Sequence, residues 1–431
     1  MDFNKQTYLT AFALFSLFFG AGNLILPPFL GYNAGEDWFW VLLGFGISAV
    51  VIPIMAIYGY ARIQGTMLDF AKKISPAVAL VYCVIVYAIS VALPAPRTAS
   101  VTYEMAVQPY SELSSLWLST IYFAIVLVFV LNRTKIISLI GKFLTPFIII
   151  LLLCIIGIGL FGDAEAMKAS IFDNGLSAGI LEGYQTFDAI GGVVVGGVIV
   201  ISLALQGKYN YEEKKKMIAK SGLLAGIGLF AIYGGLIALG AYYSATLQVE
   251  NRTELLQLLS TSTLGKIGTA FLGILVALAC FTTAVGIITG TSDFVKGLCK
   301  NSQTAYIITA VLGCVLGVAI GQFDVHYIID IALPALMFIY PITIVLIILN
   351  TLPERFASTT VFRAVALVTF LFSIPDFLGF FIAEDSVNAL KEYIPLSKYS
   401  MGWVLPALFV FVLVNLFELF RGRNTGEITA K

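Results

Sequence analysis

The sequence predicts an all-α integral membrane protein with about twelve transmembrane helices. Of its 431 residues, 59% are hydrophobic and only 12% are charged, whereas soluble domains are about 25% charged. The apolar residues form repeated runs of about twenty, and at ~1.5 Å per helical residue such a run crosses a hydrocarbon layer ~30 Å thick. Because these runs leave only short loops, a large extramembrane domain, a nucleic-acid-binding protein and a cytosolic enzyme are excluded.

An even number of spans places both termini on the same side of the membrane. Most basic residues fall in loops on that side, and the loops of the other side carry only Lys168, Arg252, Lys266, Lys391 and Lys398. By the positive-inside rule both termini are therefore expected in the cytoplasm. The expected spans are 8–30, 38–60, 77–106, 115–131, 136–161, 176–206, 222–246, 268–290, 304–321, 327–349, 362–382 and 402–420.

The first span contains an interruption, Gly20-Ala21-Gly22-Asn23, and two prolines follow it. It begins twelve residues into the span, about 18 Å along a helix, which is near mid-bilayer. Glycine permits non-helical dihedral angles, freed amides can receive an anion, and freed carbonyls with the Asn23 amide oxygen can coordinate a hard cation. The alternative is that these small residues only allow two helices to pack closely.

The sixth span has a second interruption, over residues 182–192, where polar side chains and glycines enter an apolar run. Its Asp188 is a carboxylate at membrane depth, and such residues are costly to bury and usually functional. The alternative for Asp188 is a structural ion pair with Arg97, the one basic residue placed inside a span.

Spans 1–5 and 6–10 have similar lengths, and each set opens with an interrupted helix. Since five is odd, the second set enters the membrane from the opposite side. The sequence thus predicts a 5+5 inverted repeat with discontinuous helices 1 and 6, divided as 1–161, 162–350 and a final pair of helices in 351–431. In transporters built this way the binding site lies at the midplane between the broken helices. A chance pair of glycine-rich defects is the alternative.

The eighth span carries two adjacent hydroxyls, Thr282 and Thr283, after Ala279. Thr282 and Ser16 of the first span both lie about 12 Å from the cytoplasmic ends of their spans, so they can meet at one level. Oxygen ligands suit sodium or another hard cation. The alternative is that both hydroxyls only bond back to carbonyls of their own helix.

Arg97 is expected near the outer interface, about 21 residues into the third span. One interpretation is an external gate in which Arg97 pairs with Glu104, Asp188 or Asp330. The other is an arginine that extends its head group to the interface.

Three motifs, residues 19–28 (Phe-Gly-Ala-Gly-Asn-Leu-Ile-Leu-Pro-Pro), 96–104 and 182–189, together resemble the bacterial branched-chain amino acid:cation symporters. The resemblance extends over nearly the whole chain. It implies the leucine-transporter-type fold, with two helices added to the ten-helix core, in the bacterial cell (inner) membrane. It also implies sodium-coupled import of leucine, isoleucine and valine, with membrane lipid around the protein and no required protein partner.

The resemblance also implies roles for individual residues. Two positions, Gln185 and Phe187, depart from the usual family pattern, as does the stretch before Pro96, and this leaves the side-chain preference open. The substrate is expected at Gly20, Ala21, Gly22, Asn23, Gly183, Tyr184, Gln185, Thr186, Phe187 and Asp188. Sodium is expected at the carbonyls of Ser16, Phe19 and Ala279 and the hydroxyls of Thr282 and Thr283.

Two alternatives within transport stay open: coupling to protons through Asp188, and preference for another neutral amino acid. An enzyme is not expected, because the single histidine, His326, lies in a predicted loop and no catalytic cluster accompanies it. A channel would differ from a carrier by conducting single-channel currents instead of saturable flux.

Overall fold

A computed structural model of the chain describes residues 5–132, 136–162, 166–194, 196, 210–382 and 391–428. This part of the chain is helical and contains no strand. Eight of its helical segments are long and apolar enough to cross a membrane. The predicted all-α membrane fold is therefore confirmed, whereas the count of twelve spans and the inverted repeat stay predictions.

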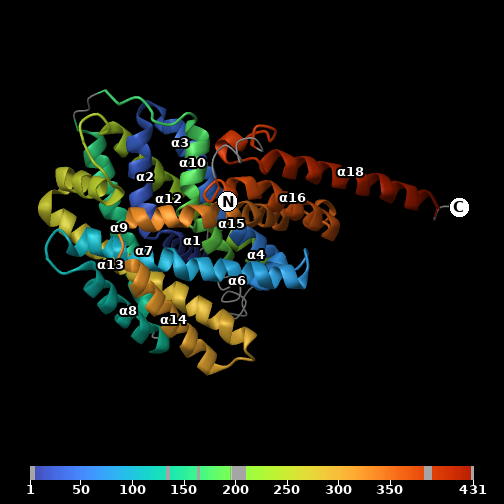
Figure 1. Cartoon of the computed structure of the whole chain (residues 1–431), viewed down its shortest axis with the longest axis horizontal. Coiled ribbons are helices and arrows are strands. Elements are labelled where there is room, and N and C mark those ends of the chain that lie inside the picture. The colour runs from blue at the N-terminus through green and yellow to red at the C-terminus, as the bar shows by residue number, and fades with distance from the viewer. Residues whose placement is uncertain are drawn as a thin grey trace.

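Figure 1 shows the arrangement of the helices, which lie along most of the predicted spans; of the predicted span 176–206, residues 195 and 197–206 lie outside the described part of the chain. Two short π-helical segments interrupt them, η2 (Ile47–Val51) and η3 (Tyr103–Val107). The α-helices are α1 (Lys5–Phe18), α2 (Ala21–Ala34), α3 (Trp38–Gly46), α4 (Ile52–Ile63), α5 (Met67–Ala71), α6 (Pro76–Ala92), α7 (Pro94–Thr102), α8 (Ser115–Asn132), α9 (Ile136–Leu160), α10 (Gly175–Tyr184), α12 (Tyr211–Tyr242), α13 (Arg252–Leu298), α14 (Gln303–Gly321), α15 (Val325–Thr351), α16 (Thr359–Leu378) and α18 (Val404–Ile428).

Both predicted interruptions are present. The first span divides into α1 and α2, with Phe19 and Gly20 between them. In the sixth span α10 ends at Tyr184, residues 185–187 are not helical, and a helix resumes at Asp188. We call residues 19–20 the first break and residues 185–187 the second break.

Two boundaries differ from the sequence prediction. The third span is divided at Leu93, and a new helix, α7, starts at Pro94 because proline has no amide hydrogen to continue the preceding helix. The residues from Arg252 to the kink at Gly265, predicted as a loop, are helical and form the first part of α13. The sequence signals this start: Asn251 accepts a hydrogen bond from the Glu254 amide, as an N-cap does.

Helices α2 and α10, which adjoin the two breaks, are each packed tightly against a neighbouring helix. A Cβ atom on Gly31 of α2 would lie 1.9 Å from a carbonyl oxygen of α12, and one on Gly240 of α12 would lie 1.8 Å from a carbonyl oxygen of α2. Gly44 of α3 and Gly179 of α10 make equally close approaches between their helices. Small residues allow such backbone contact in membrane proteins, and the contact fixes where each break lies.

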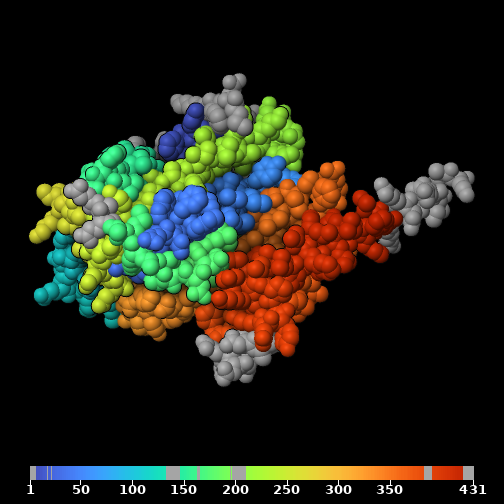
Figure 2. Space-filling model, turned by 90° about the horizontal axis from the view of Figure 1, so that it is seen from above, coloured from blue at the N-terminus to red at the C-terminus, as the bar shows by residue number. Residues whose placement is uncertain are grey.

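The final helix, α18, extends beyond the other helices at its C-terminal end. In both views α18 projects from the rest of the molecule toward the C-terminus (Figure 1; Figure 2). It packs on α16, which in turn packs on α15. The buried core of the molecule is therefore formed mainly by the helices that surround the two breaks.

Candidate functional site

Asn23 joins the two breaks. It lies in the first turn of α2, is 2% exposed, and its Oδ1 accepts a hydrogen bond of 3.3 Å from the Gly20 amide. Its Nδ2 donates to Asp188 Oδ2 and to the Tyr233 hydroxyl, each at 2.5 Å. Asp188 begins the helix after the second break and Tyr233 lies in α12, so one amide side chain connects three helices.

The first break leaves the start of α2 open. The first amides of an α-helix have no carbonyl partner within the helix. At the start of α2 the N-cap position is Gly20, which has no side chain to accept from them. In seven other helices of the described ranges the N-cap side chain accepts a hydrogen bond from an amide of the first turn; these side chains are Ser75, Asn174, Asn210, Asn251, Ser302, Asp324 and Ser358.

At the second break one side chain, Thr186, bonds to the backbone on both sides of it. The Thr186 hydroxyl donates to the Gly183 carbonyl at 2.8 Å and accepts from the Asp188 amide at 3.2 Å. Phe187 adopts a φ of 63°, a conformation that is uncommon for a bulky residue and costs of order 1–3 kcal/mol. Just before this break, the Tyr184 ring stacks on the Tyr340 ring of α15, with 4.4 Å between the ring centroids.

Arg97 lies between the two breaks and is only 4% exposed. Its Nη1 donates a hydrogen bond of 2.6 Å to the Gln185 carbonyl, and its guanidinium carbon lies 5.2 Å from the centre of the Phe187 ring. A Cβ atom on Gly22 would lie 2.5 Å from Arg97 Nη2. The sequence placed Arg97 near the outer interface; the new helix that starts at Pro94 instead carries it into the core.

The residues predicted to form a gate with Arg97 are not brought together. Glu104 of η3 accepts from the Thr253 hydroxyl at 2.5 Å and from the Val325 amide at 2.8 Å. Asp330 pairs with His326 at 3.5 Å on an exposed part of α15. Within the described ranges, Arg97 has no ion pair with Glu104, Asp188 or Asp330.

A second arginine, which the sequence placed in a loop, lies close to the second break. Arg252 pairs with Glu182 at 3.1 Å, and its Nη2 lies 3.5 Å from Gln185 Oε1. Gln185 Nε2 donates to Glu182 Oε2 at 2.9 Å, and Arg252 Nη1 lies 3.0 Å from His326 Nδ1. We call Glu182, Gln185, Arg252 and His326 the Arg252 cluster. Beside it opens a hollow of about 250 Å³.

The oxygen atoms predicted to hold sodium are partly assembled. The hydroxyls of Thr282 and Thr283 both donate to the Ala279 carbonyl, at 2.9 and 3.0 Å. This is the back-bonding that the alternative interpretation expects. The set also adjoins the first break, because a Cβ atom on Gly20 would lie 3.7 Å from Thr283 Oγ1. Ser16 lies near the end of α1, and Phe19 lies in the break itself.

Sequence reasoning missed one further buried carboxylate. Asp376 of α16 is almost fully buried and pairs with Lys391 at 3.1 Å. Its signal in the sequence is an acidic residue within an apolar run, the same signal that identified Asp188.

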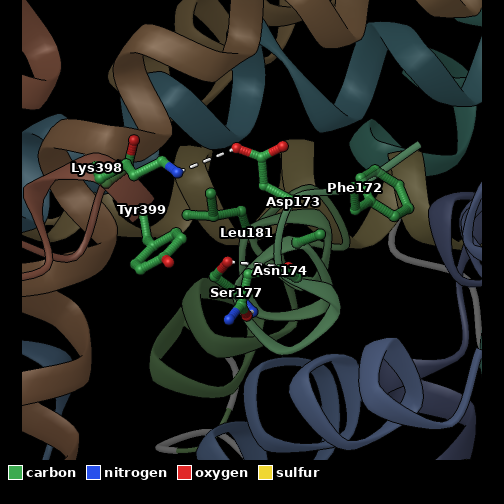
Figure 3. A pocket seen from close by; sticks show the side chains of 9 residues that line it. Phe172, Asp173, Asn174, Ser177, Leu181, Lys398 and Tyr399 are labelled. Atoms are coloured by element: carbon green, nitrogen blue, oxygen red, sulfur yellow. Dashed lines mark hydrogen bonds and ion pairs between the residues drawn. The ribbon is translucent and has the colours of Figure 1, made fainter. Parts of the chain in front are cut away.

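One surface cavity, of about 180 Å³, lies away from the predicted site (Figure 3). The ion pair of 3.3 Å between Lys398 and Asp173 lies at its edge, and Asn174 and Ser177, joined by a hydrogen bond, lie on the opposite side. Its lining contains no residue of either break. It is therefore not the place where the predicted residues meet.

The chain is similar to a family of known transporters along almost its whole length. Residues 3–421 match the family described as "Branched-chain amino acid transport protein". The chain is 31% identical to branched-chain amino acid permease BrnQ of Bacillus subtilis, covering 96% of each chain. It is also 31% identical to the branched-chain amino acid transport system 2 carrier protein of Pseudomonas aeruginosa, again covering 96% of each.

Solved structures of more distant proteins share the fold. The inward-facing conformation of Mhp1 matches with a TM-score of 0.58 at 14% identity, covering 95% of this chain and 91% of that one. A manganese transporter of Eremococcus coleocola matches with a TM-score of 0.57 at 14% identity, covering 96% and 95%. At this identity the likeness shows the fold alone.

Proposed function

The chain belongs to the branched-chain amino acid transport protein family, and from this premise we propose that it imports leucine, isoleucine and valine together with sodium. It is a carrier of the bacterial cell membrane, and both termini lie in the cytoplasm. The observation that carries the proposal is the pair of adjoining helix breaks, joined by Asn23 at 2.5 Å to Asp188.

The two breaks provide the groups that a zwitterion needs. The uncapped amides at the start of α2 and the positive end of that helix suit a carboxylate. Asp188, 5% exposed, suits the ammonium group. Apolar side chains of the core surround both, and Phe19 and Phe187 at the breaks are themselves buried, which fits a hydrocarbon side chain.

Sodium fits the oxygen set beside the first break. Ala279, Thr282 and Thr283 offer one carbonyl and two hydroxyl oxygens within about one helical turn, and Ser16 and Phe19 offer carbonyls at the end of α1. Hard cations prefer oxygen ligands. A bound cation at this place would fix the first break in one conformation, which is a physical route to coupling between cation and substrate.

The same arrangement supports transport by alternating access. With the termini in the cytoplasm, the Arg252 cluster lies on the outer side of the breaks. Its ion pair joins α10 to α13, and the Arg252 guanidinium also lies 5.2 Å from the Phe29 ring of α2. These contacts close the outer side, so opening toward the outside requires that they separate.

The test is leucine uptake into proteoliposomes, with choline replacing sodium at constant pH. We expect saturable uptake that requires sodium. Uptake unchanged in choline would contradict sodium coupling and favour protons carried by Asp188, and single-channel currents would contradict a carrier. Competition by isoleucine and valine, but not by other neutral amino acids, tests the side-chain preference.

A variant separates the cation set from the rest of the protein. Thr282→Ala removes one hydroxyl, and we expect a several-fold higher sodium concentration for half-maximal leucine binding to the purified protein. Thr309→Ala is the matched control, because its hydroxyl also donates to a carbonyl of its own helix, that of Ala305 in α14. Equal sodium dependence in both variants would remove Thr282 from the cation set.

A further inference from the structure

We propose that Arg97 is a substrate-binding residue whose guanidinium, with the uncapped amides of α2, holds the carboxylate of the transported amino acid. This inference rests on the function proposed above and assigns Arg97 a role different from that of a gate. The juxtaposition that carries it is a buried guanidinium placed between the two helix breaks.

The position of the guanidinium is fixed from three sides. The Gln185 carbonyl accepts from Nη1 at 2.6 Å, the Phe187 ring lies 5.2 Å from the guanidinium carbon, and the backbone of Gly22 lies against Nη2. Because Gly22 is the second residue of α2, the guanidinium is directly beside the open amides of that helix. The positive charge of Arg97 and the positive end of α2 therefore lie next to each other at Gly22.

The charge of Arg97 has no counter-ion within ion-pair distance. In the described part of the chain no carboxylate oxygen lies within 4.0 Å of it, and the contact with the Gln185 carbonyl is its only hydrogen bond. A buried charge that no ion pair compensates is costly, and the largest favourable charge interaction of Arg97 is with Asp188, which lies beyond ion-pair distance. Arg252 shows the contrast, since it is also mostly buried but pairs with Glu182 at 3.1 Å.

A bound amino acid would supply the carboxylate that Arg97 lacks within ion-pair distance. Its carboxylate would pair with Arg97 and accept from the amides of α2, because guanidinium groups bind carboxylates through two parallel hydrogen bonds. Its ammonium would face Asp188, to which Asn23 donates a hydrogen bond of 2.5 Å. The bound zwitterion would then have an opposite charge at each end.

The rival explanation is that Arg97 only supports the second break through the Gln185 carbonyl. The two explanations differ in the ligands that they affect. A supporting role would weaken binding of every ligand equally, whereas a carboxylate partner affects only ligands that carry a carboxylate. Leucinol, in which a hydroxymethyl group replaces the carboxylate of leucine, separates them.

The experiment measures binding of leucine and of leucinol to purified wild-type protein, Arg97→Gln and Arg97→Lys in sodium. We expect Arg97→Gln to weaken leucine binding about 100-fold, since removing one partner of a buried charge pair is costly. Leucinol binding should change less than about threefold. Arg97→Lys keeps the charge but not the paired geometry, so about a tenfold loss for leucine alone is expected.

Arg355→Gln is the matched control, because Arg355 is exposed and lies over the Phe356 ring, away from the breaks. Equal losses for leucine and leucinol, or no loss for leucine, would overturn the proposal. If Arg97→Gln does not fold, Arg97→Lys decides, and a wild-type ratio of leucine to leucinol affinity in that variant would overturn it. Wild-type protein that binds no branched-chain amino acid would instead overturn the proposed function.

Discussion

The two helix breaks are built in opposite ways. The first uses Gly20 and leaves the amides of α2 without a side-chain cap, whereas at the second the Thr186 hydroxyl accepts from the Asp188 amide, the first amide of the helix that follows. The first break therefore leaves backbone amides without a side-chain acceptor, whereas at the second break one such amide is already bonded. This difference predicts that a ligand binds at the first break, whereas the second supports its surroundings, including Arg97 through the Gln185 carbonyl.

The largest expected effect comes from filling the space between the first break and Arg97. In Gly22→Ala the added methyl group would lie 2.5 Å from Arg97 Nη2, so the guanidinium has to move. Overpacking of this kind costs about 1–3 kcal/mol, and we expect leucine binding to weaken by up to about 100-fold, measured on purified protein. Gly157→Ala is the control, because a Cβ atom there meets nothing within 4 Å. Wild-type affinity in Gly22→Ala would break the comparison.

Separating the breaks from each other should come next in size. Asn23→Ala removes the hydrogen bonds to Asp188 and Tyr233 and leaves the buried carboxylate with one partner fewer. We expect the free energy of unfolding to fall by about 2 kcal/mol, measured as a lower melting temperature in detergent, with loss of leucine uptake. Asn415→Ala, in a partly exposed part of α18, loses only bonds to backbone carbonyls and serves as the control. Equal melting temperatures would show that Asn23 does not join the breaks.

A cap introduced at the first break would make it resemble the second. Gly20 has extended dihedral angles, and a Cβ atom there would make only ordinary contacts, the nearest at 3.7 Å to Thr283 Oγ1, so serine fits and can accept from the amides of α2. In Gly20→Ser we expect an unchanged or higher melting temperature together with about tenfold weaker leucine binding, because the serine competes for those amides. Gly20→Ala, which adds a Cβ atom without an acceptor, is the control. Stronger leucine binding in Gly20→Ser would contradict a role for these amides.

The smallest effect is expected from opening the second break. Thr186→Ala removes the cap on the Asp188 amide, and such a loss costs about 1 kcal/mol. We expect a lower melting temperature and less than a threefold change in leucine affinity. Thr186→Ser, which keeps the hydroxyl, should restore the melting temperature. A large loss of leucine affinity at unchanged stability would mean that the second break also binds the substrate.

The two breaks can be predicted from the sequence because their residues differ in chemical type from the apolar residues around them. Gly20, Gly22 and Asn23, and Gln185, Thr186 and Asp188, are glycines or polar residues in apolar runs, where a membrane span seldom contains them. The close packing of α2 on α12 could not be predicted in the same way, since it depends on which helices meet. Tyr233 was missed for that reason: nothing in its own span marks it as the partner of Asn23.

Arg97 and Arg252 show the limits of counting residues along a span. The count for Arg97 assumed one continuous helix, but the chain begins a new one at Pro94 and all of α7 is buried. Arg252 was placed in a loop because hydropathy alone does not reveal a short polar helix. Both arginines contact Gln185, which lies far from each of them in the sequence.

Gln185 also connects Arg97 to the Arg252 cluster. Its main-chain carbonyl accepts from Arg97, while its side-chain amide lies in the Arg252 cluster. Thermodynamic linkage is reciprocal, so if a ligand bound at Arg97 favours the Arg252–Glu182 pair, that pair favours the ligand by the same free energy. A compound without a carboxylate lacks the proposed contact with Arg97, so we expect it to leave the Arg252–Glu182 pair unchanged.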